Sequence, residues 1–325
     1  MVKKIGGRGR VMEQWNKLIC CKLFISESRN RSALEAIEEA GRRWREAEAV
    51  IVNKLEDKAY NRVRYTIVSY CDIDGHNNNS SSSPLQQMVM AMVEAAFETI
   101  NLENHSGAYP RLGVVDEILF HPLADASLHQ AAMLARAVAI DLATKFQVPV
   151  YLYGAAHPTW KALDIIRREL GYYTPNSTGN QWAGWTVPEA LPQKPNEGPI
   201  SMSKERGIAM IGARPWIGLY NVPIMTTDIS MAQKLAKMVS EKGGGLPTVQ
   251  TLGLAHGDDH TEIACMLLEP NKIGADQVQN RLEKLGAQEG LHVKKGYFTD
   301  FSSEKIVEKY INLISAKKES PRSRL

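Results

Sequence analysis

The sequence of 325 residues contains no uninterrupted apolar run close to the about 18 residues that a membrane-spanning helix requires. Its four cysteines are Cys20, Cys21, Cys71 and Cys265, and no two of them form a C-x-x-C pair. It also lacks the G-x-S-x-G turn of serine hydrolases and the Gly-Lys-Ser/Thr ending of a phosphate loop. These absences argue against a membrane partner and against those two enzyme classes, and they favour free thiols in a reducing compartment.

The net charge is small and unevenly distributed. It is +3 overall, but residues 1–10 contribute +4 and residues 316–325 contribute +3, which leaves residues 11–315 at −4. A mildly acidic body argues against nucleic acid as a partner. The 44% hydrophobic and 23% charged residues are typical of a globular protein, and the length favours two domains, each with its own core.

Hydrophobic periodicity predicts strands and helices along most of the chain. The clearest helix has Ser83 as its N-cap and Pro84 as its first residue, with Gln86 as the reciprocal capping partner, and it extends to Phe97. The other predicted helices run from Ser28 or Asn30 to about Ala47 and over 127–146, 163–170, 228–240, 276–285 and 303–313. The predicted strands are 22–26, 50–52, 63–68, 114–120, 148–153, 208–211, 219–225, 249–255, 261–268 and 292–298.

Proline and glycine residues between 171 and 206 break this pattern and favour a domain boundary there. We predict an α+β fold, an α/β sandwich of two subdomains, each a mixed β-sheet with helices mainly on one face, and a ligand cleft between them. Residues 20–200 form the first subdomain and 205–315 the second, with basic tails at 1–19 and 316–325. The amides and indoles at 176–185 either line this cleft or anchor an exposed linker.

Candidate catalytic side chains gather in one loop and the strand that follows it. His105 and His121 are candidate general bases, because histidine has an unperturbed pKa near ~6.5. Tyr109, with a reference pKa near ~10, is a hydrogen-bond donor rather than a base. Arg111 could hold a carboxylate with two hydrogen bonds, and Asp116 could accept from an amino–amide edge. The alternatives are that His121 caps a strand end and that Arg111 pairs with Asp116.

Two further histidines, His256 and His260, lie four residues apart across a predicted hairpin turn at 257–259. They have no third ligand-like partner in the sequence nearby. We therefore predict no zinc site here, and no metal elsewhere.

Five short blocks of the sequence together carry a family resemblance. They are Asn61-Arg62-x-x-Tyr65-Thr66, Gly107-x-x-Pro110-Arg111-Leu112-Gly113-x-x-Asp116, Val148-Pro149-Val150-Tyr151-Leu152-Tyr153-Gly154, Gly212-Ala213-Arg214 with Asn221, and Thr248-Val249-Gln250-Thr251-Leu252-Gly253. In order and spacing they resemble the two subdomains of the glutamate formiminotransferase family, collinearly from about residue 20 to 315. The sequence departs from the family at Tyr109, because in the family a histidine directly precedes Pro-Arg.

The resemblance implies a folate-binding transferase of one-carbon metabolism and histidine degradation, which moves a formimino or formyl group between a glutamate derivative and tetrahydrofolate. It implies a folate and substrate site formed by Asn61, Arg62, Arg111, Asp116, Tyr153, Gly154, Arg214 and Asn221, with Tyr109, His105 and His121 as catalytic candidates. The alternative is a catalytically impaired folate-binding homologue, because Tyr109 replaces the expected catalytic histidine.

The resemblance also implies a homodimer that needs no metal and works in the cytoplasm. A second possibility for the location comes from the tripeptide Ser323-Arg324-Leu325, which is a variant of the peroxisomal address Ser-Lys-Leu.

Overall fold

The computed structural model describes residues 17–44, 48–71, 83–185 and 190–318. Most of both basic tails and the tripeptide 323–325 lie outside these residues. The described ends of the tails are regular, because the first strand begins at Lys17 and the last helix ends at Lys318. Within the described ranges, no helix combines the length and the hydropathy that crossing a membrane requires.

The larger of the two main sheets has six strands in the order β2-β3-β1-β5-β8-β6. They are β1 (Lys17–Ile25), β2 (Val50–Asp57), β3 (Arg62–Tyr70), β5 (Val115–Ala124), β6 (Val150–Gly154) and β8 (Ala209–Ala213). The pairing is antiparallel from β2 to β5 and parallel across β5, β8 and β6. This mixed sheet with its helices confirms the predicted fold class.

The predicted second subdomain, 205–315, includes the residues of strand β8. In the structure, β8 belongs to the larger sheet. It pairs with β5 on one side and with β6 on the other, so it lies inside the larger sheet. All five of its residues are buried. The physical reason is that Ala-Met-Ile-Gly-Ala presents no polar face, which suits a central parallel strand covered on both sides.

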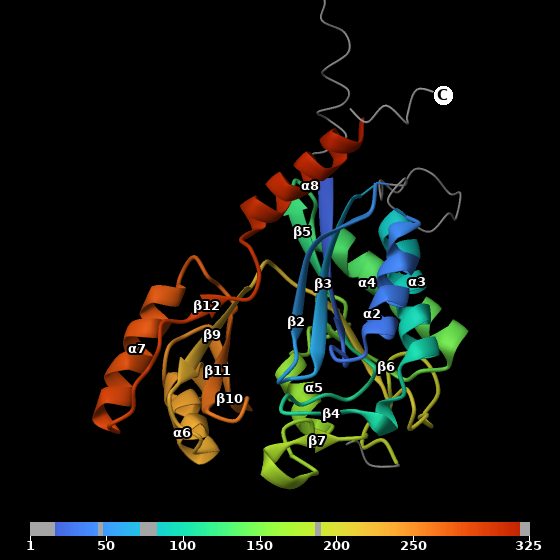
Figure 1. The fold of residues 1–325 in the computed structure, drawn as a ribbon. Helices are drawn as coiled ribbons and strands as arrows, with labels where there is room; N and C mark the ends of the chain where they lie inside the picture. The colour runs from blue at the N-terminus through green and yellow to red at the C-terminus, as the bar shows by residue number, and fades with distance from the viewer. Residues whose placement is uncertain (1–16, 45–47, 72–82, 186–189, 319–325) are drawn as a thin grey trace, which may run out of the picture.

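Three helices cover one face of the larger sheet (Figure 1): α2 (Arg31–Arg42), α3 (Pro84–Thr99) and α4 (Leu128–Phe146). Asn30 and Ser83 cap the first two, as predicted, and Ser127 caps the third. Gln86, the predicted capping partner, donates its side-chain amide to Asp141 of α4 at 2.7 Å. The apolar faces of these three helices and the inward-pointing residues of the strands form the main hydrophobic core.

The opposite face of this sheet is covered at its two sides. Helix α5 (Leu163–Glu169) packs against β6 and β8, and helix α8 (Ser303–Lys318) packs against β1 and β2. Between these helices, β1, β3 and β5 turn side chains toward the second subdomain. This gap in the helical cover positions the candidate site.

The second subdomain has a four-stranded antiparallel sheet in the order β10-β11-β9-β12. Its strands are β9 (Gly218–Ile224), β10 (Val249–His256), β11 (His260–Leu267) and β12 (Tyr297–Phe298), and α6 (Ile229–Val239) and α7 (Ala275–Gln288) cover one face. The predicted turn at 257–259 joins β10 to β11. The segments 214–217 and 299–302 link this subdomain to the larger one.

The remaining elements are short. A two-stranded sheet that the sequence did not predict pairs β4 (Ser106–Gly107) with β7 (Trp182–Ala183), and single 3₁₀ turns occupy Leu102–Asn104, Thr178–Asn180 and Glu241–Gly243. The strand predicted at 292–298 is reduced to β12. All four cysteines are buried free thiols.

Candidate functional site

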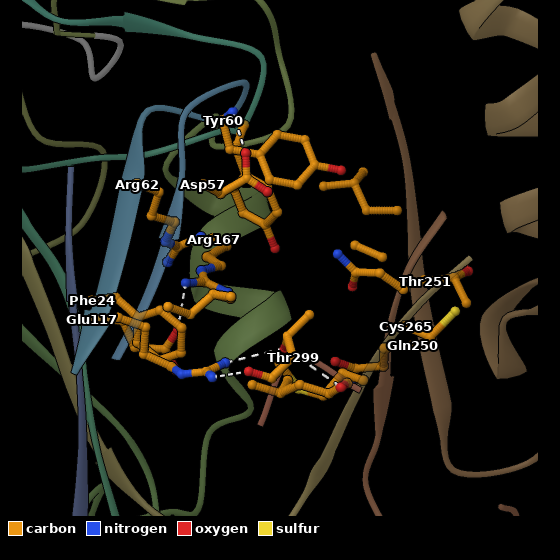
Figure 2. A pocket seen from close by; sticks show the side chains of 18 of the residues that line it. Phe24, Asp57, Tyr60, Arg62, Glu117, Arg167, Gln250, Thr251, Cys265 and Thr299 are labelled. Carbon is orange, nitrogen blue, oxygen red and sulfur yellow. Dashed lines mark hydrogen bonds and ion pairs between the residues drawn. The ribbon is translucent and has the colours of Figure 1, made fainter. Parts of the chain in front are cut away.

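A cavity of about 970 Å³, measured to its open mouth, lies between the two main sheets. Figure 2 shows Arg62, Glu117 and Arg167 on one wall, with Gln250, Thr251 and Cys265 facing them. The full lining is Phe24, Leu55, Asp57, Tyr60, Arg62, Arg64, Tyr109, Glu117, Arg167, Tyr172, Tyr173, Leu219, Asn221, Gln250, Thr251, Leu252, Ala264, Cys265, Met266 and Thr299. Its mixture of aromatic and polar walls is typical of sites that bind small organic ligands.

Strand alternation explains which residues line the cavity. On β3, Val63 and Tyr65 point into the main core, so Arg62 and Arg64 point to the other face. On β5, Ile118 points into the core and Glu117 into the cavity. The cavity wall is thus the uncovered face of the larger sheet.

Buried ion pairs hold the arginines of this wall. Arg62 Nη2 lies 2.9 Å from Asp116 Oδ2, and Arg167 Nη2 lies 2.9 Å from Glu117 Oε2 and 3.5 Å from Asp116 Oδ2. Glu117 also accepts a hydrogen bond from the hydroxyl of Tyr153 at 2.6 Å. Since each of these charges is paired in a low-dielectric site, the guanidinium groups are fixed in place before a ligand binds.

The arginines retain donors that the described residues leave unused. The buried Nε atoms of Arg62, Arg64 and Arg167 have no hydrogen-bond partner among these residues. Buried polar groups are normally satisfied, so unsatisfied donors at a cavity are an observation that requires an explanation. A ligand with carboxylate groups would supply the acceptors, because guanidinium and carboxylate match in charge and shape.

Tyr109 lies in the cavity wall and belongs to the loop of residues 105–116, here called the signature loop. The Arg62 guanidinium lies 4.5 Å from the centre of its ring, and the ring of Tyr60 meets it edge-on at 5.0 Å. The ring is therefore packed between a cation and a second aromatic side chain.

His105 lies outside the cavity lining and is buried. Its Nδ1 atom accepts a hydrogen bond from Asn61 Nδ2 at 3.1 Å, and Asn61 in turn accepts from the backbone amide of Ser28 at 2.9 Å. Burial, with the charge of Arg111, lowers the pKa of His105 to about 2. The imidazole and Asn61 thus hold the loop, and a neutral ring this weakly basic is a poor proton acceptor.

His121 is also buried and absent from the cavity lining. Its Nδ1 atom donates to the carbonyl oxygens of Arg214 and Pro215, at 3.0 and 3.1 Å, just after β8 ends. Burial, with the charge of Lys22, holds its pKa well below the usual range. This geometry favours the structural alternative that His121 caps a strand end.

These two histidines predict acid sensitivity. Both stay neutral in the folded chain, so the unfolded chain binds more protons as the pH falls below about 6.5, and stability present above that pH is lost. We expect the free energy of unfolding to fall by up to about 1.4 kcal/mol per pH unit for each histidine. Urea denaturation between pH 7 and 5 measures this slope. The variant His105→Gln should show a shallower slope, and an unchanged slope would contradict the assignment.

Three of the predicted ligand-binding residues make contacts within the protein and lie outside the cavity lining. Arg111 donates to the carbonyl oxygens of His105 and Gly184, both at 3.1 Å, which fixes the signature loop. Gly154 has a positive φ of 59°, and a Cβ there would lie 2.5 Å from a backbone oxygen of Ala213. Arg214 contacts the sulfur of Met266 at 3.8 Å, at the junction of the subdomains. None of these three is in the lining.

Asn221 lies in the wall that belongs to the second subdomain. Its side chain donates to Glu262 Oε2 at 2.8 Å, and the hydroxyl groups of Tyr60 and Tyr297 donate to the same carboxylate at 2.7 and 2.6 Å. Glu262 is buried and was not a sequence candidate. The network connects both subdomains beside the cavity.

Sequence reasoning also missed Asp57, Arg64, Glu117 and Arg167 as lining residues. Arg64 had a signal, because it lies two residues after Arg62 on a strand and so shares its face. The sequence indicated Arg167 less clearly, as a charged residue on the side of α5 that is buried. The indole of Trp182 is buried against Tyr60 rather than lining the cleft.

No group of histidine, cysteine, aspartate and glutamate side chains in the described ranges is arranged to hold a metal ion.

Comparison with known proteins agrees with this architecture. Residues 18–214 match the family model described as formiminotransferase domain, N-terminal subdomain. The chain is 48% identical to the formiminotransferase cyclodeaminase-like protein of Arabidopsis thaliana, over 91% of this chain and 97% of that protein. It is 30% identical to the glutamate formimidoyltransferase of Thermoplasma acidophilum, over 72% of this chain and 71% of the relative. It is 27% identical to the formimidoyltransferase-cyclodeaminase of Rattus norvegicus, over 71% of this chain and 38% of the relative.

The family match extends from β1 to the end of β8, and this stretch contains every strand of the larger sheet and the loop that carries Tyr109. The relatives from Arabidopsis thaliana and Thermoplasma acidophilum extend the similarity into the second subdomain. This chain therefore belongs to the formiminotransferase family, and its arginine-lined cavity lies between the two subdomains.

Proposed function

We propose that the cavity binds a tetrahydrofolate-type ligand together with a glutamate derivative, and that the protein transfers a formimino or formyl group between them. The observation that carries this proposal is the row of Arg62, Arg64 and Arg167 along one wall, each with a buried Nε donor left unused. The carboxylates of both ligands would accept from these donors. The name of the Thermoplasma acidophilum relative supports the same substrate class.

The other lining residues fit the flat rings of a folate. Phe24, Tyr60, Tyr172 and Tyr173 offer ring faces and edges for stacking. The side-chain amide of Gln250 offers both donors and an acceptor to the edge of a pterin. The hydroxyl of Tyr109 can donate a hydrogen bond to charge that develops in the tetrahedral intermediate of the transfer.

A second candidate is a folate-binding homologue with impaired catalysis. The observation that favours it is the absence of both candidate bases, His105 and His121, from the cavity lining, while Tyr109 is in it. A phenol with a reference pKa near ~10 is a poor proton acceptor at neutral pH.

Calorimetric titration with tetrahydrofolate and a transferase assay on the same preparation distinguish the two. Binding with turnover of formiminoglutamate or a formylfolate supports the transferase, and binding without turnover supports the impaired homologue. No binding of tetrahydrofolate by correctly folded protein would refute both.

We predict that Tyr109→His increases the turnover number, by about 10²-fold or more if a general base is what the site lacks. An imidazole in the same wall has a pKa near neutrality, so it can take a proton from the attacking amine. Initial rates with saturating formiminoglutamate measure the effect. Tyr109→Phe is the matched control and should bind folate with little change in Kd. No gain in rate with folate binding intact would contradict the prediction.

The homodimer and the cytoplasmic or peroxisomal location remain predictions from the sequence and the family.

A further inference from the structure

Four side chains form a continuous chain of hydrogen bonds beside the cavity, here called the histidine bridge: Asp57, His256, His260 and Asp259. His256 Nε2 lies 3.0 Å from Asp57 Oδ2, His256 Nδ1 lies 3.3 Å from His260 Nε2, and His260 Nδ1 lies 2.7 Å from Asp259 Oδ1. Asp57 ends β2 in the first subdomain, and the other three belong to the β10–β11 hairpin in the second. The bridge therefore joins the two subdomains.

The three hydrogen bonds require more protons than two neutral imidazoles carry. The bond to Asp57 needs a hydrogen on His256 Nε2, and the bond to Asp259 needs one on His260 Nδ1, because carboxylates only accept. The bond between the rings needs a third hydrogen, on either nitrogen. Two neutral imidazoles have two N–H groups, so the complete bridge holds one extra proton and carries one imidazolium charge.

The surroundings of His256 favour that charge. Asp57 faces it from β2, Glu262 of β11 lies 4.0 Å from its Nε2, and Asp259 lies beyond His260 in the turn. Tyr60, in the turn between β2 and β3, packs its ring edge-on at 4.7 Å and gives its own proton to Glu262. The two imidazole rings of the bridge thus lie among three carboxylates. Hydrogen bonding to Asp57 raises the pKa of His256 against the effect of burial.

The bridge lies at the end of the cavity away from one of the covalent links between the subdomains. Figure 2 shows Asp57 and Tyr60 at one end of the cavity and Thr299, in the link at 299–302, at the other. Figure 1 shows the β10–β11 hairpin beside the ends of β2 and β3. Two subdomains that pivot about a covalent link move furthest apart at points distant from that link. A contact at such a point therefore restricts the separation of the two cavity walls most strongly.

We propose that the histidine bridge is a protonation-controlled clamp that holds the two subdomains together beside the cavity. With the extra proton present, all three hydrogen bonds form, as in the structure, and the hairpin is held against Asp57. When the proton is lost, the two remaining N–H groups can still donate to the two carboxylates, but the contact between His256 and Asp57 loses its ionic attraction, and the hairpin separates from Asp57 more readily. Opening rises as the pH rises through the pKa of the bridge, so ligands enter and leave faster at alkaline pH.

Hydrogen–deuterium exchange of the ligand-free full chain tests the clamp. Peptides covering 50–62 and 249–267 should exchange up to about tenfold faster at pH 8.5 than at pH 5.5, after correction for the intrinsic rates, if the pKa in the closed state exceeds that in the open state by one unit. His256→Gln keeps a polar side chain of similar length without a titratable ring, and it should exchange fast at both pH values. His157, which lies outside the cavity lining and whose ring accepts a hydrogen bond from the backbone of Thr159 in its own loop, supplies the matched control His157→Gln, which should behave as wild type.

A wild-type hairpin whose corrected exchange is independent of pH would overturn the clamp, and so would a His256→Gln variant that keeps the wild-type pH response. If that variant does not fold, Asp57→Asn replaces it, because asparagine keeps the acceptor oxygen and removes the charge. It should move the transition to lower pH, and an unmoved transition counts against the proposal. No folate is present in these experiments, so the result is independent of the proposed function.

Discussion

Replacing Asp300 by alanine is expected to lower the free energy of unfolding by about 3–5 kcal/mol, the usual cost of removing one partner from a buried ion pair. The Asp300 carboxylate lies 3.3 Å from Lys22 Nζ and 3.7 Å from Arg64 Nη2, and it accepts hydrogen bonds from Asn53 and Thr66. Lys22 and Arg64 are both buried, so the substitution leaves two cations without this carboxylate. Asp300 also lies in the link before α8, so the docking of that helix depends on it.

Urea denaturation of wild type and variant at pH 7 measures this loss. The matched control is Glu269→Ala, which removes an exposed carboxylate paired with Lys272 and should cost less than about 1 kcal/mol. A loss for Asp300→Ala as small as that of the control would show that the buried cluster does not hold the link. The loss should also shrink in acid: burial opposes ionisation of Asp300, but Lys22 and Arg64 hold its pKa below the usual value, so the stabilisation fades as the carboxylate is protonated.

The second large effect concerns ligand binding. Arg62→Gln is expected to weaken binding of tetrahydrofolate or formiminoglutamate by about 10- to 100-fold, because one hydrogen bond to a charged group contributes about 1.5–3 kcal/mol. Arg62 lines the cavity, and its buried Nε donor is unused by the described residues. Asp116 keeps Arg167 at 3.5 Å in this variant, so the carboxylate is not left without a cation.

The control for this prediction comes from the sequence candidates themselves. Arg214 was predicted to bind the ligand with Arg62, but it lies outside the cavity lining and is only partly buried. Arg214→Gln should therefore change Kd less than about twofold, as measured by the same calorimetric titration. Equal losses in the two variants would mean that the binding site is not the cavity described above.

The sequence by itself determined the local structure and the family. Asn30, Ser83 and Pro84 mark where α2 and α3 begin, because helix starts depend on side chains within a few residues. Alternation along β3 placed Arg62 and Val63 on opposite faces for the same local reason. The collinear blocks identified the formiminotransferase family, and Tyr109, the residue at which the sequence departs from the family, lines the cavity.

Only the tertiary structure decided which polar residues face the cavity. His105 and His121 have the right chemistry in the right loop and strand, yet packing buries them against Asn61 and the end of β8. His256 and Asp57 are 199 residues apart, and they meet only because the second sheet faces the gap between α5 and α8. Side-chain type and strand period are local properties, whereas burial, pKa and partnership depend on which surfaces pack together, and no short stretch of sequence contains that information.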